Sequence, residues 1–284
     1  MKGGYFLFNG KFHKEEEAVF TLAELSQRTE GFIEQFRAEH NEVLFADSIC
    51  EHLIATAETI GADLTGVIDP GAKLLRKDVS RLLNKNKLYL AAKIEIQLFP
   101  SDHRINLLLR AEETERGFYP LKEPGLLLSI YRDRLKDISP AAAYATSGTF
   151  LWQKARQTAR QLGQPNLILL NAQGFACECI HGSFALLNDN QVLFPAASSG
   201  GYRSAILQEV IISAKAAGFK VGEKEAITTD ELLLAEELFL FDSSNGIQKV
   251  LGLDERRYFS TKTHLIAGRF SALAQKDREE KDKG

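Results

Sequence analysis

Residues Asn166–Pro195, NLILLNAQGFACECIHGSFALLNDNQVLFP, decide the fold because they predict four strands in close succession. NLILL is typical of a buried strand, and Asn171–Gly174 has the composition of a turn. FACECI, SFALL and QVLFP continue the strand series. Serines and glycines at residues 198–201 then precede a predicted helix from about Tyr202 to Ala217. Strands and helices therefore alternate through the second half of the chain.

Further signals continue the pattern on both sides of this stretch. Thr228 and Glu231 have capping-box spacing for a short helix, which the strand ELFLF follows. Near the start, Asn9-Gly10 lies between strand-forming residues and is typical of a tight hairpin turn. The other predicted elements are strands at 34–38, 87–100, 104–112 and 125–130 and helices at 45–60, 72–84 and 150–162.

A cluster of proline and glycine at residues 117–125 separates two apolar segments and is the predicted domain boundary. We therefore expect an N-terminal α/β domain at 1–119, a linker at 120–124 and a C-terminal α/β domain at 125–272. The last residues, 273–284, are predicted to be a charged tail, because KDREEKDKG has no apolar face. The expected fold class is α/β or α+β with two domains.

Composition excludes several classes of protein. The chain has 284 residues, of which 44% are hydrophobic and 26% charged, so we do not expect a largely disordered chain. A net charge of −3 supplies no general attraction for nucleic acid or anionic membranes. Three cysteines cannot form a disulfide framework, and no segment has the length of a membrane span or signal peptide. We expect a cytoplasmic protein that binds neither nucleic acid nor membrane.

General catalytic motifs are absent: the sequence has no Walker loop, GxGxxG, GxSxG or HExxH. Cys177, Cys179 and His181 alternate along one predicted strand, and their spacing favours buried thiols over a zinc site, so no metal is predicted. Glu178 lies on the opposite face of that strand among apolar residues. It is either an exposed-face glutamate or a buried carboxylate that needs a partner.

Several ordered segments together resemble the class IV aminotransferases, which use pyridoxal phosphate (PLP) and have fold type IV. The family includes branched-chain and D-amino-acid aminotransferases and 4-amino-4-deoxychorismate lyase. The segment 166–195 is similar to its strand, turn and glutamate hairpin, and GGYRSAILQEVIISAKAAGFKV to its "G-I-T-R" helix start. ITTDELLLAEELFLFDSSNGIQKV and GFIEQFRAEHNEVLFADSICEHLIATAETIG match two further family segments.

The resemblance implies a D-amino-acid aminotransferase-like fold and assigns roles to individual residues. Glu178 would face the ring nitrogen of PLP, and Gly201 and Tyr202 would offer amides to its phosphate where a helix begins. Arg203 completes the "G-I-T-R" match, while Ser243 takes the place of the threonine that meets the phosphate, with Ser244 beside it. The resemblance also implies a homodimer and a small amino- or oxo-acid, or another anionic ligand.

Two of the departures from the family concern residues that hold PLP. The lysine that carries PLP is expected at residues 144–146, most closely at Ala145, and ISPAAAYATSGTF contains no lysine. The first lysine downstream is Lys154, which lies inside the predicted helix and more than two turns away from that position. The phosphate-binding arginine aligns with His52, which is shorter and only partly charged. No catalytic set is therefore intact.

These losses argue against PLP-dependent activity and leave three hypotheses open. The first is a pseudoenzyme that keeps the fold to bind another anionic small molecule or a protein. The second is a functional aminotransferase or 4-amino-4-deoxychorismate lyase that works with a non-standard base. The third is cofactor-independent chemistry in the inherited cleft, for which the sequence names no base.

Overall fold

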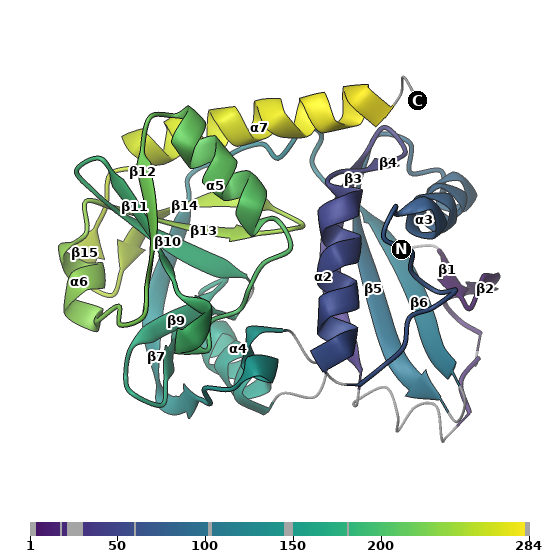
Figure 1. The fold of residues 1–284 in the computed structure, drawn as a ribbon, viewed down its shortest axis with the longest axis horizontal. Coiled ribbons are helices and arrows are strands. Elements are labelled where there is room, and N and C mark those ends of the chain that lie inside the picture. The colour runs from purple at the N-terminus through teal and green to yellow at the C-terminus, as the bar shows by residue number, and fades with distance from the viewer. Residues whose placement is uncertain are drawn as a thin grey trace. The chain divides into compact units, whose positions relative to one another are not determined.

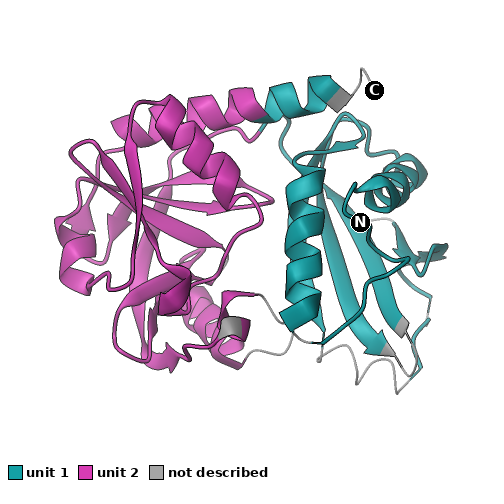
Figure 2. Ribbon diagram, in the orientation of Figure 1, with its two compact units in different colours: residues 1–118, 145–148, 274–284 teal, residues 119–144, 149–273 magenta. Residues whose placement is uncertain are grey.

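The computed structural model describes residues 4–17, 19–21, 31–59, 61–101, 104–144, 150–180 and 182–281. The chain divides into two compact units (Figure 2). Unit 1 comprises residues 1–118, 145–148 and 274–284, and unit 2 comprises residues 119–144 and 149–273. The predicted residue Ala145 lies outside the described residues, as does His181.

Unit 1 contains a six-stranded antiparallel sheet in the order β2-β1-β6-β5-β3-β4 (Figure 1). Asn9 and Gly10 both have positive φ and connect the first hairpin, as the sequence predicts. Two helices pack on this sheet, α2 against β3 and α3 against β1 and β6. The bounds are β1 Tyr5–Phe8, β2 Lys11–Lys14, β3 Phe32–Glu39, β4 Glu42–Val43, α2 Ala46–Thr59, α3 Lys73–Asn86, β5 Ala91–Ser101 and β6 Arg104–Glu113.

Unit 2 is built on a nine-stranded mixed sheet in the order β12-β11-β10-β13-β14-β7-β8-β9, with β15 paired to β14. The pairs β11–β12, β14–β7 and β7–β8 are parallel. Its strands are β7 Leu126–Lys136, β8 Leu167–Asn171, β9 Ala176–Cys179, β10 Ser183–Asn188, β11 Gln191–Pro195, β12 Lys220–Lys224, β13 Glu237–Asp242, β14 Gly246–Leu253 and β15 Arg256–Arg257. Its helices are α4 Phe150–Leu162, α5 Leu207–Ala216 and α6 Thr229–Leu234, and α7 covers Thr261–Lys281.

The apolar core of unit 2 is formed by side chains of β7, β8, β10, β13 and β14, together with residues of α6. Thr228 caps α6 as predicted, with Glu231 completing the capping box. The quoted stretch 166–195 forms β8, β9, β10 and β11, which confirms the predicted strand series. The two sheets with their helices confirm the mixed α/β class.

Two predicted boundaries are wrong. The charged tail is helical as far as Lys281, because α7 continues through it. Ala274 is buried there, and the Asp277 carboxylate accepts a hydrogen bond of 2.9 Å from the amide of Phe45. The second error concerns the helix predicted from Tyr202, since α5 begins only at Leu207. None of the described helices is both long and apolar enough to cross a bilayer.

Candidate functional site

Glu178 is the centre of the candidate site, and its side chain has no exposed surface. It lies in β9, where all four residues are buried on both faces of the strand. The exposed-face alternative considered for Glu178 is therefore wrong. Leu169 of β8 is its register partner, and the β8–β9 ladder shifts register immediately afterwards. A buried carboxylate at this depth requires hydrogen-bond donors and a compensating charge.

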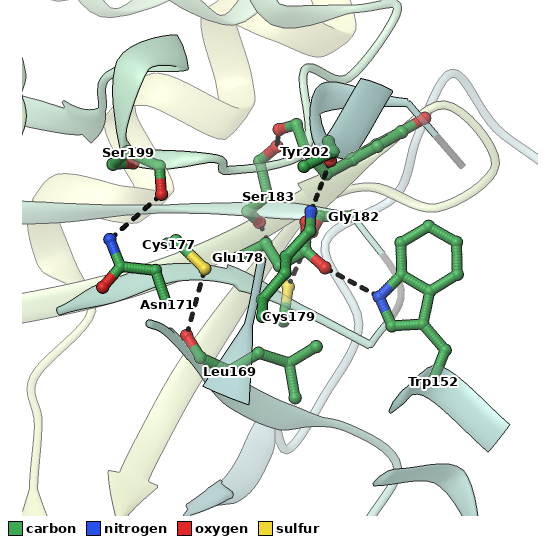
Figure 3. A network of polar contacts seen from close by, with 12 residues as sticks. Trp152, Leu169, Asn171, Cys177, Glu178, Cys179, Gly182, Ser183, Ser199 and Tyr202 are labelled. Carbon is green, nitrogen blue, oxygen red and sulfur yellow. Dashed lines mark hydrogen bonds and ion pairs between the residues drawn. The ribbon is translucent and has the colours of Figure 1, made fainter. Parts of the chain in front are cut away.

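Three donors surround the carboxylate. The indole Nε1 of Trp152 donates a hydrogen bond to Oε1 (Figure 3). The two atoms are 2.7 Å apart. The ammonium of Lys136 forms an ion pair with Oε2, and the backbone N–H of Tyr202 also donates to the carboxylate. Burial raises the pKa of Glu178, while Lys136, Trp152 and the Tyr202 amide each oppose that rise.

Lys136 is the residue that sequence reasoning missed. It is the last residue of β7, a strand predicted to end at Ile130. The ammonium also donates to the carbonyl of Ala142, and it lies 5.7 Å from the centre of the Trp152 ring. Only 6% of the residue is exposed. The structure thus places a buried cation on the carboxylate that the resemblance assigns to a cofactor.

The segment 201–203 is held by backbone contacts within the protein. The backbone amide of Arg203 donates a hydrogen bond of 2.9 Å to the carbonyl of Ala143. The hydroxyl of Ser183 donates a hydrogen bond to the carbonyl of Tyr202. Since α5 begins at Leu207, with Ile206 as its N-cap residue, Tyr202 lies outside the first turn of that helix. The expectation that Gly201 and Tyr202 open a helix is therefore wrong. The amides of Tyr202 and Arg203 have internal acceptors instead.

Gly201 has a packing role in this segment. A Cβ built on it would lie 2.3 Å from the carbonyl oxygen of Cys177 in β9, so the loop approaches the strand more closely than any side chain allows.

We expect Gly201→Ala to lower the free energy of unfolding by about 1–3 kcal/mol, because the added carbon meets backbone rather than a flexible side chain. The matched control is Gly268→Ala in α7, where no atom lies within 4 Å of the added Cβ. That change is expected to stabilise the helix by about 0.5–1 kcal/mol. Urea unfolding of both variants checks the difference, and equal midpoints would contradict the close-packing role.

The serines of the turn after β13 differ in their contacts. Ser244 uses both its amide and its hydroxyl on the Asp242 carboxylate, at 2.8 and 2.7 Å. The carbonyl of Ser243 accepts from the Tyr119 hydroxyl at 3.0 Å, whereas its own hydroxyl is buried and has no hydrogen-bond partner among the described residues. Ser243 Oγ is therefore available to a ligand in a way that Ser244 is not.

The remaining predicted residues have other environments. His52 belongs to α2 of unit 1, where its Nε2 lies 3.5 Å from Glu34 Oε2 and both residues are buried. Arg203 is exposed. Burial raises the pKa values of Cys177 and Cys179, which disfavours the thiolate that a metal site or a nucleophile requires. No group of three metal-binding side chains occurs in the part of the chain that the structure describes.

Comparison with known proteins agrees with this architecture. Residues 31–253 match the family described as amino-transferase class IV. The "Probable branched-chain-amino-acid aminotransferase" of Thermotoga maritima is 22% identical over 259 residues, which are 89% of this chain and 88% of that protein.

Solved structures show the same fold at low sequence identity. The branched-chain aminotransferase of Thermoproteus uzoniensis with norvaline has a TM-score of 0.81 at 21% identity, covering 98% of this chain and 97% of that one. A hypothetical aminotransferase from Mycobacterium tuberculosis in its PLP-bound form has a TM-score of 0.81 at 13% identity, covering 96% and 100%. The fold is thus that of the fold type IV enzymes, and the chain belongs to the class IV aminotransferase family.

Proposed function

We propose that this chain is a pseudoenzyme of the class IV aminotransferase family, which keeps the fold without carrying out a PLP-dependent reaction. The observation that carries the proposal is the buried ion pair between Lys136 and Glu178. Family members bind PLP, and the resemblance assigns Glu178 to the protonated ring nitrogen. In this chain an internal cation already occupies that place on the carboxylate.

Lys136 does not fit the role of a relocated cofactor-binding lysine. The ring nitrogen of PLP and the carbon that bonds to lysine lie on opposite sides of a six-membered ring. A lysine that bonds to the cofactor must therefore stand a full ring away from the carboxylate at the nitrogen. Lys136 instead contacts that carboxylate directly. The segment 145–149, which lies outside the described residues, has the sequence ATSGT and contains no lysine.

The phosphate side fits PLP no better. Of the backbone groups expected to hold the phosphate, the Tyr202 amide donates to Glu178, and the neighbouring Arg203 amide donates to Ala143. Neither amide lies in the first turn of α5. Ser244 is bound to Asp242. The Glu178 carboxylate, the Tyr202 amide and Ser244 are thus committed to contacts within the protein, and we derive no reaction step through PLP.

The test is to incubate the purified protein with PLP and to record the yellow absorbance of lysine-bound PLP. Borohydride reduction and mass spectrometry then show whether any lysine has gained the cofactor. We expect neither signal, and no transamination of branched-chain amino acids with 2-oxoglutarate. The Thermotoga maritima relative, treated identically, is the positive control. A reduced PLP adduct on any lysine, or turnover abolished by Glu178→Ala, would contradict the proposal.

One observation favours the alternative, a PLP-dependent aminotransferase or 4-amino-4-deoxychorismate lyase with a non-standard base. The hydroxyl of Ser243 is buried without a partner among the residues described, as a phosphate-binding side chain would be in the absence of its ligand. The same hydroxyl also suits a different anionic small molecule, which the pseudoenzyme could bind. A homodimer and a cytoplasmic location remain predictions from the resemblance and the composition.

A further inference from the structure

The Glu178 carboxylate depends on one charged partner. Its other donors, the Trp152 indole and the Tyr202 amide, are neutral groups. Among the described residues, Lys136 is the only cation in contact with the carboxylate. Because an unpaired buried charge is far more costly than a buried pair, the ammonium of Lys136 is what makes an ionised Glu178 tolerable at this depth.

The surroundings of the ammonium have the chemistry of a receptor for a primary amine cation. Glu178 Oε2 and the carbonyl oxygen of Ala142 both accept its N–H groups, and the ring of Trp152 lies 5.7 Å away. Carboxylate, carbonyl and aromatic ring are the groups that recognise organic ammonium ions. Ala142 belongs to the short 3₁₀ helix Pro140–Ala143, which Ser139 caps, so the acceptor is held in place.

We propose that Glu178, the Ala142 carbonyl and Trp152 form an alkylammonium-binding site that the side chain of Lys136 fills from within. Lys136 is thereby the counter-ion of the Glu178 carboxylate. This inference rests on the proposed function, because it requires the site to be occupied by Lys136 rather than by a cofactor. Removing the side chain should open the site to a free amine of matching size.

The experiment is rescue of Lys136→Ala by n-propylammonium, which replaces the deleted three methylene groups and the ammonium. We expect the substitution alone to lower the folding equilibrium constant by about two to four orders of magnitude. Added n-propylammonium should raise that constant by a factor of one plus the ratio of its concentration to its dissociation constant, which is about tenfold at about ten times that dissociation constant. Urea unfolding at constant ionic strength measures the change. Should the variant be unfolded in buffer, the amine is expected to restore its circular dichroism spectrum.

Two control variants separate the site from a general salt effect. Lys136→Ala/Glu178→Gln lacks the carboxylate and should not respond to the amine. Lys249→Ala removes another buried lysine, but its partner Glu123 has 67% of its side chain exposed, so water can solvate the carboxylate left behind. Tetramethylammonium, which has no N–H to donate, should not rescue Lys136→Ala. All of these control measurements are made at the same ionic strength.

A folding constant of Lys136→Ala that does not rise with n-propylammonium concentration, or an equal rise in Lys136→Ala/Glu178→Gln, would overturn this inference. Such a failure is distinguishable from failure of the proposed function, which is tested on the wild-type chain with PLP. A wild-type PLP adduct refutes the proposed function. No adduct together with no amine rescue refutes only the assignment of the ammonium site.

Discussion

Lys136→Met is expected to lower the free energy of unfolding by about 3–5 kcal/mol, the cost of leaving a buried charge without its partner. Methionine keeps most of the volume of lysine, so the loss reports charge rather than a cavity. Glu178 has no exposed surface through which water could replace the ammonium. Urea unfolding at neutral pH measures the change.

The loss of unfolding free energy in Lys136→Met should depend on pH, because it involves the ionisation of Glu178. Burial raises the pKa of Glu178 and Lys136 opposes that rise, so in Lys136→Met the pKa of the carboxyl should rise further. A carboxyl group with a raised folded pKa stabilises the fold fully below its unfolded pKa, and this contribution is lost as pH rises through the folded value. The destabilisation should therefore be larger at about pH 8 than at about pH 5.

The double variant Lys136→Met/Glu178→Gln is the control. It removes both charges while keeping the approximate volumes, and such replacements of buried pairs are often neutral or stabilising. We expect it to recover most of the stability that Lys136→Met loses. A double variant as unstable as the sum of the two single variants would show that the residues act independently, against the assigned ion pair.

Arg37→Met is expected to lower the free energy of unfolding by about 3–5 kcal/mol, because it breaks a second buried ion pair, which lies in unit 1. Arg37 and Glu39 of β3 are 2% and 1% exposed, and Arg37 Nε donates to Glu39 Oε1 at 2.9 Å. Its terminal nitrogen donates both to Glu39 and to the carbonyl of Glu115. Burial raises the pKa of Glu39, and the guanidinium opposes that rise.

Arg37→Lys is the informative companion, because it keeps the charge but loses the forked geometry of the guanidinium. It should recover only part of the stability lost in Arg37→Met. If the free energy of unfolding of Arg37→Met were within about 0.5 kcal/mol of the wild-type value, the prediction that Glu39 depends on Arg37 would be contradicted. n-Propylammonium should leave both Arg37 variants unchanged, since the proposed amine site belongs to unit 2.

Local sequence signals were sufficient for much of the fold. The hairpin at Asn9-Gly10, the amphipathic helix α2 and the capped helix α6 are each specified by neighbouring residues. The strands β8 to β11 follow from apolar runs separated by turns. Glu178 could also be singled out, because a carboxylate flanked by apolar residues on a strand calls for a special partner.

The partner itself could not be predicted, because it is 42 residues away in sequence. At the end of β7 the usual burial of apolar residues and exposure of charged residues is reversed, since Leu135 is 48% exposed and Lys136 is buried. A pattern based on burying apolar residues therefore ends the strand at Ile130 and assigns Lys136 to the surface. Only the pairing of β7 with β8, which brings Lys136 beside Asn171, places the ammonium inside.

Two further boundaries depended on long-range contacts. The last helix continues into a charged segment because Asp277 accepts the Phe45 amide, a contact across 232 residues. The helix after Gly201 begins late because the amides of Tyr202 and Arg203 bond to Glu178 and Ala143 instead. In both places a distant partner outweighs the local preference of the sequence.

The most direct measurement is a high-resolution crystal structure of the protein grown with excess PLP. The prediction is that the Nζ atom of Lys136 contacts Glu178 and Ala142, with no ring between the lysine and the carboxylate. A pyridine nitrogen bound to Glu178, with Lys136 displaced, would contradict the account.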